Sequence, residues 1–294
     1  TFDSNLFVDG IDVENWKLLN DSLDKPLINR PLRGVYPPGS TFKPFAALAG
    51  LENDKRKPPF SIYDSGFYTL PNSAHRYRDW KPGGHGNVDM RKAITISCDT
   101  FFYGLAVELG IERLTNFVRH FGFGRKSGID IAGEVGGLLP TPEWKQRRFK
   151  QPWYMGETVI VGIGQGYTLA TPMQLAQATA ILANRGVAMR PHLVSAITNA
   201  KSGISEATQA IISDKILLDE NNSEIVRLGM VDVTLPGGTA ASVGANAGYS
   251  IAAKTGTAQV VGIKQNEKYN ANLIDERHRD HALFIAYAPA EDPK

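Results

Sequence analysis

The pattern of apolar and polar positions divides the chain into a helix-rich body and two strands near its C-terminal end. Between residues 90 and 121, apolar residues stand three or four positions apart, which predicts helices broken near Ser97 and Gly110. The clearest repeat is Ile111, Leu114, Val118 and Phe121, with Gly122 as a natural end. Residues 251–261 and 282–288 predict two strands that pair antiparallel.

Another helix has an explicit start signal. Thr171 is followed by Pro172 and Gln174, which together form a capping box with proline in the first turn. We expect this helix to reach about residues 184–185, with Gly186 closing it.

The remaining segments are less regular in pattern. Four stretches are predicted to be loops or irregular structure: 1–39, 53–87, 202–222 and 234–248. Residues 5–8 form a short strand candidate, and Ser223 is expected to cap a helix over 223–231. The predicted fold class is therefore mixed α/β (α+β), with a helical lobe and an antiparallel sheet that is discontinuous in sequence and meets the helices at a groove.

Composition narrows the function classes only modestly. The chain has 294 residues, 42% hydrophobic and 21% charged, with a net charge of +2, which is ordinary for a globular domain and gives no argument for nucleic acid as a partner. It holds no run of ~18–20 apolar residues, no signal peptide and one cysteine. The start at Thr1, and a strand-like run at 281–288 with no second arm after it, suggest an excised domain that lacks its C-terminal strand.

Three short motifs in a fixed order indicate a serine acyl-transfer site without a catalytic histidine. They are Ser40-Thr41-Phe42-Lys43, Ser97-Cys98-Asp99 and Lys254-Thr255-Gly256-Thr257. A serine hydroxyl needs a neighbouring base, and Lys43 stands three residues after Ser40, on the same face if Ser40 opens a helix. The breaker run Tyr36–Gly39 before Ser40 predicts that start. Each motif alone is weak, but the ordered set is typical of β-lactamases and penicillin-binding proteins.

The chain also resembles class B penicillin-binding proteins over nearly its whole length. The segments that carry the likeness are 33–41, 77–81, 99–103, 143–146, 162–166 and 171–174. Asp99 stands where most relatives have Asn, and in this respect the chain is similar to the cell-elongation branch of the family in Gram-negative rods. The loop Gly162–Gly166 lacks the spacing and lysine of a phosphate-binding loop, so we attribute its glycines to close backbone packing beside the site.

The resemblance implies a penicillin-binding, serine β-lactamase-like transpeptidase fold and peptidoglycan D,D-transpeptidase activity in cell elongation and rod shape. Stem peptides would be the substrates, β-lactams would acylate Ser40, and no cofactor would be needed for catalysis. It also implies an N-terminal membrane anchor and a pedestal domain, both absent from this chain. The expected location is the periplasmic face of the inner membrane, with a membrane glycan polymerase and elongation-complex proteins as partners.

Roles at the site follow from side-chain chemistry together with this resemblance. Ser40 is the expected nucleophile and Lys43 its base, which must be free of its own proton; the second positive charge of Lys254 favours that. Ser97 can relay a proton to the leaving amine. Three residues of the last motif should meet the substrate: Thr255, Gly256 and Thr257. The family parallel assigns the oxyanion hole to the backbone N–H groups of Ser40 and Thr257.

Asp99 conflicts with part of this scheme. Its side chain can orient Lys43 or Ser97 by hydrogen bonding. An ionised carboxylate beside Lys43 would favour the protonated lysine and oppose its role as base. A carboxylate that points elsewhere would remove the conflict.

Four residues with metal-ligand chemistry stand close together in the sequence: Asp64, Asp79, His85 and Cys98. Zn²⁺ accepts oxygen, nitrogen and sulfur ligands, and a metal would stabilise a loop with little regular structure. The spacings match no standard zinc finger, and Cys98 could equally be a small buried apolar residue. The family resemblance favours a structural zinc with this ligand set, and His75 is the nearest rival ligand. If residues 97–99 are extended, Cys98 faces away from Ser97 and Asp99.

Two other functions stay open at this point. A hydrolase on the same fold, either a D,D-carboxypeptidase or a serine β-lactamase, would need a group that activates the deacylating water, and no motif marks one. A non-enzymatic β-lactam sensor would share the first and third motifs. Segments such as 77–81 argue against the sensor.

Overall fold

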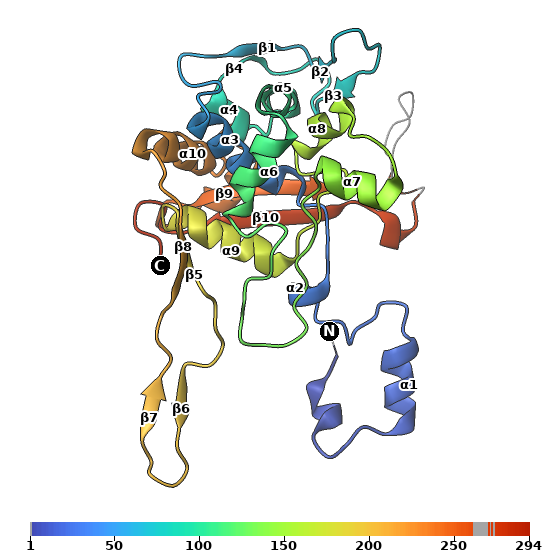
Figure 1. Ribbon diagram of the computed structural model, residues 1–294, viewed down its shortest axis with the longest axis vertical. Coiled ribbons are helices and arrows are strands. Elements are labelled where there is room, and N and C mark those ends of the chain that lie inside the picture. The colour runs from blue at the N-terminus through green and yellow to red at the C-terminus, as the bar shows by residue number, and fades with distance from the viewer. Residues whose placement is uncertain (1, 261–269, 271, 273) are drawn as a thin grey trace.

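Helices form most of the body of the molecule, and a pair of antiparallel strands crosses its middle (Figure 1). The structure is a computed structural model that describes residues 2–260, 270, 272 and 274–294. The α-helices are α1 Val13–Asp21, α2 Arg30–Arg33, α3 Lys43–Glu52, α4 Met90–Thr95, α5 Asp99–Leu109, α6 Ile111–Arg119, α7 Pro142–Phe149, α8 Met155–Val161, α9 Pro172–Ala183, α10 Glu220–Asp232 and α11 Ala241–Gly244. The 3₁₀ helices are η1 Ser4–Phe7, η2 Gly39–Phe42 and η4 Glu276–His278.

The strands are short except for the central pair. They are β1 Ile62–Asp64, β2 Phe67–Tyr68, β3 Tyr77–Arg78, β4 Gly86–Val88, β5 Val187–Met189, β6 Ala196–Thr198, β7 Ser205–Ala207, β8 Ile212–Lys215, β9 Ala252–Ala258 and β10 His281–Tyr287. All described pairs are antiparallel: β1 with β4, β2 with β3, β5 with β8, β6 with β7 and β9 with β10. In the central pair, Ala252 lies opposite Tyr287 and Ala258 opposite His281.

Helix α3 is the centre of the helical lobe. Every residue from Lys43 to Leu51 is buried, and a helix that is covered on all sides needs neighbours all around it. Helices α4, α5, α6 and α10 provide them. Phe45 packs its ring 5.3 Å from Phe121 and 5.2 Å from Phe123, so the helix that follows the candidate nucleophile is anchored in aromatic core.

The strand pair β9–β10 separates this lobe from α9, which packs on β10 (Figure 1). Helix α10 contacts both α4 and β9, and η2 contacts both strands. The turn that carries Ser40 is therefore wedged between the buried helix α3 and the sheet. Two segments project from the body: residues 2 to about 30, with α1, and the arm that runs from β5 through β6 and β7 to β8 (Figure 1).

Most predicted elements are present, and the exceptions have local causes. The breaks near Ser97 and Gly110 separate α4, α5 and α6, and the Thr171 capping box starts α9 as expected. The strand expected at 5–8 is wrong, because Asp3 accepts a hydrogen bond from Asn5 N–H and starts η1 instead.

Several other element boundaries in the structure differ from the predicted ones. Helix α1 lies within the stretch expected to be irregular, where Asp12 accepts from Asn15 N–H and caps it. Helix α10 is capped by Asp219 rather than Ser223, which places its start one turn earlier. The stretches 53–87 and 202–222 contain short strands instead of loops alone. The predicted strand over 251–261 is described as far as Ala258, and residue 261 lies outside the described residues. Among the described helices, none is both long and apolar enough to cross a membrane.

Candidate active site

Ser40 and Lys43 lie at the start and the end of one tight turn. The predicted α-helix from Ser40 begins instead as the 3₁₀ helix η2, and α3 starts at Lys43. Pro44 explains why the turn is a 3₁₀ helix, because it has no N–H to donate to the Ser40 carbonyl four residues earlier. Lys43 N–H bonds that carbonyl instead. In a 3₁₀ turn, side chains three residues apart eclipse one another, so the turn holds Ser40 and Lys43 on one face.

The Lys43 ammonium connects the first motif to the second. Its side chain is fully buried, and Nζ donates to Ser97 O at 2.8 Å, Ser97 Oγ at 3.1 Å and Asp99 Oδ1 at 2.6 Å. These three partners match the three N–H donors of an ammonium group. A lysine in this position is held rigidly, and it can exchange a proton with Ser97 Oγ.

Ser97 adopts a backbone conformation that non-glycine residues rarely take. Its φ is +59°, at the point where the chain leaves α4 and enters α5. The segment therefore contains a left-handed turn, and the condition of an extended segment at residues 97–99 is not met. The turn still sends the two side chains to different partners, since Ser97 contacts Lys43 and Cys98 lies 3.5 Å from Asp64 Oδ2. Backbone strain of this kind is common at functional sites.

The Asp99 carboxylate does not point away from Lys43. Besides Lys43, it accepts from Trp80 N–H at 3.2 Å through its second oxygen. Burial raises the pKa of the Asp99 carboxyl, and the Lys43 charge opposes this shift. The conflict between Asp99 and a basic Lys43 is therefore present in the structure, although burial disfavours the ionised form of the carboxyl group.

The third motif lies on β9. Alternation along a strand puts Thr255 and Thr257 on one face, and these two residues are half-buried and exposed. Lys254 lies on the opposite face, fully buried, and its Nζ donates to Thr255 O at 3.0 Å. Burial and then the Lys43 charge hold the pKa of Lys254 well below its ordinary value. The second lysine expected beside Lys43 is therefore present within the same buried region, although burial disfavours its charged form.

Two glycines let the nucleophile turn touch β9. Gly39 has a φ of +54°, and a Cβ there would lie 2.4 Å from Thr257 O. A Cβ on Gly256 would lie 2.7 Å from Thr41 Cγ2. Neither position has room for a side chain. The nucleophile turn consequently packs directly against the backbone of β9, and Ser40 lies in sequence between the two contacting residues, Gly39 and Thr41.

Sequence reasoning missed two residues at this site. Thr239 Oγ1 lies 2.7 Å from Thr255 Oγ1, and the two hydroxyls share a hydrogen bond. Trp80 donates from its indole Nε1 to Ile96 O at 3.1 Å, which fixes an exposed ring beside the second motif. Trp80 lies in segment 77–81, whose resemblance to the family could have indicated that it belongs to the site. Nothing local marks Thr239.

The four candidate metal ligands come together beneath the second motif. One ligand atom from each of Asp64, Asp79, His85 and Cys98 lies within 4.8 Å of the others. His85 Nε2 is 3.1 Å from Asp79 Oδ1. The rival ligand His75 is exposed, with its ring against Tyr77 instead. Two carboxylates, an imidazole and a buried thiol form a donor set that fits tetrahedral Zn²⁺.

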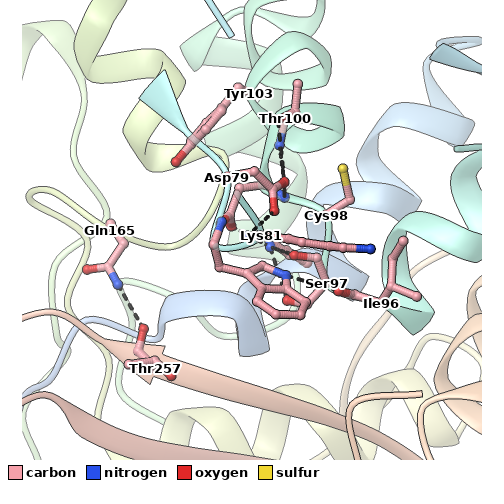
Figure 2. Close-up of polar contacts among 12 residues, drawn as sticks. Asp79, Lys81, Ile96, Ser97, Cys98, Thr100, Tyr103, Gln165 and Thr257 are labelled. Atoms are coloured by element: carbon pink, nitrogen blue, oxygen red, sulfur yellow. Dashed lines mark hydrogen bonds and ion pairs between the residues drawn. The ribbon is translucent and has the colours of Figure 1, made fainter. Parts of the chain in front are cut away.

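Hydrogen bonds from the backbone hold this cluster in place. The other oxygen of Asp79 accepts from Asp99 N–H at 2.7 Å and Thr100 N–H at 3.2 Å (Figure 2). Although burial opposes it, bonds from the Lys81 and Thr100 N–H groups hold the pKa of Asp79 below its ordinary value. Burial and the Asp79 charge raise the pKa of the Cys98 thiol. A bound cation would favour the thiolate, so the cluster has the chemistry of a metal site that supports the start of α5.

A family model and curated proteins both match this chain to penicillin-binding transpeptidases. Residues 1–294 match the family model of the penicillin binding protein transpeptidase domain. Among curated proteins, the chain is similar to the peptidoglycan D,D-transpeptidase MrdA of Haemophilus influenzae, at 46% identity over all of this chain and 45% of the relative. The MrdA protein of Acinetobacter baumannii is 45% identical over all of this chain and 43% of its own length. The chain thus spans about half the length of these curated relatives.

Solved structures of penicillin-binding proteins are also similar to this chain. A crystal structure of Pseudomonas aeruginosa penicillin-binding protein 2 (PBP2) in complex with WCK 5153 superposes with a TM-score of 0.85 and 46% identity, covering all of this chain and 60% of that one. PBP2 of Helicobacter pylori in complex with MreC has a TM-score of 0.82 and 35% identity, over 99% of this chain and 50% of the other. The predicted fold, a helical lobe plus an antiparallel sheet, is confirmed.

Proposed function

Because this chain belongs to the penicillin-binding protein transpeptidase family, we propose that it is the catalytic domain of a peptidoglycan D,D-transpeptidase of the PBP2 type. In this proposal the whole protein cross-links stem peptides during cell elongation and maintains rod shape. Support comes from the MrdA relatives and from the order of the three motifs along the chain.

One observation carries the assignment of the site. The buried Lys43 Nζ donates to Ser97 Oγ and Asp99 Oδ1 while its backbone N–H is bonded to the Ser40 carbonyl. The backbone bond places Lys43 one 3₁₀ turn after Ser40 and on the same face, which supports the lysine, once it has lost a proton, as the base for the serine. We assign Ser40 as nucleophile, Lys43 as base and Ser97 as proton relay. Asp99 and Lys254 adjust the charge around Lys43.

The proposed reaction has two acyl transfers. Ser40 Oγ attacks the carbonyl carbon of the penultimate D-alanine and its proton passes to Lys43. Collapse of the tetrahedral intermediate breaks the amide bond, and the departing D-alanine amine receives a proton through Ser97. An amine of a second stem then attacks the ester, and its proton returns to Ser40. Thr255 and Thr257 would bind the terminal carboxylate, and the close packing at Gly256 lets the peptide lie along β9.

We further propose a structural zinc ion held by Asp64, Asp79, His85 and Cys98. Bound there, the ion supplies stability and no chemical step, because the four ligands leave it without an open position. Its effect on the site would pass through Asp79, which accepts from the N–H groups at the start of α5. Second-sphere contacts of this kind orient neighbouring groups.

The proposal includes β-lactams as ligands, since they would acylate Ser40 in place of the stem peptide. It also includes elongation-complex proteins as partners of the whole protein. The H. pylori relative was solved with MreC, and another structural relative, 33% identical, belongs to a peptidoglycan synthase complex. The active site would then face the periplasm, where the stem peptides are.

Labelling with a fluorescent penicillin tests the proposal. We expect stoichiometric, long-lived labelling of the wild type, with the adduct on Ser40 by peptide mapping, and none on Ser40→Ala. Labelling of Ser40→Ala would contradict the site. Release of the label within seconds would indicate a β-lactamase instead. Formation of cross-links from stem peptides by the full-length protein would separate a transpeptidase from a sensor, which forms none.

A further inference from the structure

The loop Gly162–Gly166 lies between the nucleophile turn and the strand of the third motif. It leaves the end of α8, and Gly164 O accepts a hydrogen bond from Gly39 N–H at 2.9 Å. Gly164 has a φ of +70°, and a Cβ there would lie 2.4 Å from Gly39 O. At Gly164 the prediction of close backbone packing is confirmed. The packing partner is the residue immediately before Ser40.

Gln165 in the same loop makes a bond to the other side of the site. Its side chain is buried, with 8% exposed, and Nε2 donates to Thr257 O at 2.9 Å (Figure 2). A carbonyl oxygen only accepts, so the amide nitrogen must be the group that faces it. Neighbouring residues of one loop therefore hold η2 through Gly164 and β9 through Gln165.

The direction of the Thr257 carbonyl also indicates the direction of the Thr257 N–H. In an antiparallel strand, the N–H and C=O of one residue point to the same edge. The Thr257 carbonyl faces Gln165 and Gly39, away from β10, where Ala282 is its register partner. The Thr257 N–H consequently lies on the edge that faces the nucleophile turn, which is the edge where an oxyanion formed at Ser40 would be.

We infer that Gln165 is a positioning residue for the oxyanion hole. By holding the Thr257 carbonyl, it fixes the orientation of β9 at the residue whose N–H stabilises the tetrahedral intermediate. Gly164 fixes the position of the turn that carries the other donor, Ser40 N–H. This inference rests on the proposed function, because it needs an acyl-enzyme at Ser40. It assigns a catalytic purpose to a loop that the three motifs leave unexplained.

The physical effect of losing this bond is specific. Without a donor at Gln165, the Thr257 carbonyl is left unpaired beside Gly39, and the strand can rotate to satisfy it. A rotation that tilts the Thr257 N–H weakens a contact made mainly in the transition state. The rate of acylation should then fall, while the affinity for the non-covalent complex changes little.

Three variants of the full-length protein test this inference. Gln165→Leu removes the donor, and Gln165→Glu keeps the size but replaces the donor with an acceptor. The matched control is Gln174→Leu, since Gln174 is also buried and donates to the carbonyls of Gly122, Arg125 and Gly136, away from the strand of the third motif. Stopped-flow acylation by a penicillin separates the dissociation constant from the acylation rate constant, and final labelling counts the folded fraction.

We expect both Gln165 variants to lower the acylation rate constant about 10-fold or more, with less than about a 3-fold change in the dissociation constant. The control should lower Tm but leave the rate constant of the folded fraction within about 3-fold of wild type. Unchanged rate constants in both Gln165 variants, with normal labelling of wild type at Ser40, would overturn this inference alone. A loss in the control equal to that in the Gln165 variants would also overturn it. Absence of Ser40 labelling in wild type would overturn the proposed function as well.

Discussion

Lys43 Nζ lies 2.6 Å from Asp99 Oδ1, inside a region where the lysine side chain has no exposed surface. Ser97 occupies the remaining donors of the ammonium group. The base proposed for Ser40 is thus paired with a carboxyl group in the ground state. Any step that uses the neutral amine has to work against that pair, which makes Asp99 a control point for the pH dependence of acylation.

Replacing Asp99 with Asn should shift that dependence toward acid. The amide keeps hydrogen-bonding groups but removes the negative charge that stabilises the protonated lysine. We expect the pH of half-maximal acylation rate to fall by about one unit or more, measured with a fluorescent penicillin between pH 5 and 9. The backbone N–H of residue 99, which bonds Asp79, is retained, so metal content should stay the same. An unmoved pH profile would show that the carboxylate does not control the base.

Two substitutions of Ser97 should differ in stability but lose activity to a similar extent. Its φ of +59° favours glycine, so Ser97→Gly should be more stable than Ser97→Ala by about 1 kcal/mol. Both variants lack the hydroxyl that accepts from Lys43, and both should acylate at least about 100-fold more slowly. Urea unfolding and penicillin labelling measure the two effects. Equal stability of the two variants would contradict the strained turn.

Lys254 should make the stability of the protein rise with pH. Its pKa is well below the ordinary value in the folded state, so between the two pKa values the unfolded chain binds more protons. The free energy of unfolding therefore increases with pH in that window, by up to about 1.4 kcal/mol per unit from this residue. Lys254→Met should remove this contribution. The stability of wild type relative to Lys254→Met should rise from pH 6 to pH 10, and a constant difference would refute the assignment.

The metal cluster predicts loss of stability on chelation. Purified protein should contain one zinc per chain, and removal by a strong chelator should lower Tm by at least about 5 °C. Cys98→Ser should bind zinc more weakly and resist further destabilisation by chelator. His75→Ala is the control, because His75 is exposed and lies outside the cluster. Protein free of zinc, with unchanged Tm in chelator, would rule out the site.

Thr239 should influence binding of the substrate carboxylate. Its hydroxyl bonds that of Thr255 at 2.7 Å, and thereby orients a group expected to contact the carboxylate. Thr239→Val keeps the shape but loses the hydroxyl, and should weaken non-covalent binding of a penicillin about 3- to 10-fold. Thr239→Ser retains the hydroxyl and serves as the control. A change in the acylation rate constant without a change in binding would contradict this role.

Local sequence was sufficient for features that depend on neighbouring residues. The capping box at Thr171, the breaks at Ser97 and Gly110, and the identity of the three motifs could all be read directly. The 3₁₀ turn at Ser40 could have been predicted as well, since Pro44 cannot donate to the Ser40 carbonyl. The errors at 5–8 and at the start of α10 came from capping by Asp3 and Asp219, which are also local signals.

The sequence by itself determined which chemical groups this protein brings to its site and which helices and strand carry them. Only the tertiary structure decided how these groups meet. Lys43 and Asp99 are 56 positions apart, and Gln165 and Thr257 are 92 apart. Contacts over such separations depend on how α3, α5 and β9 pack together, and no periodicity or spacing in the chain encodes the distance or direction of one side chain relative to another after that packing.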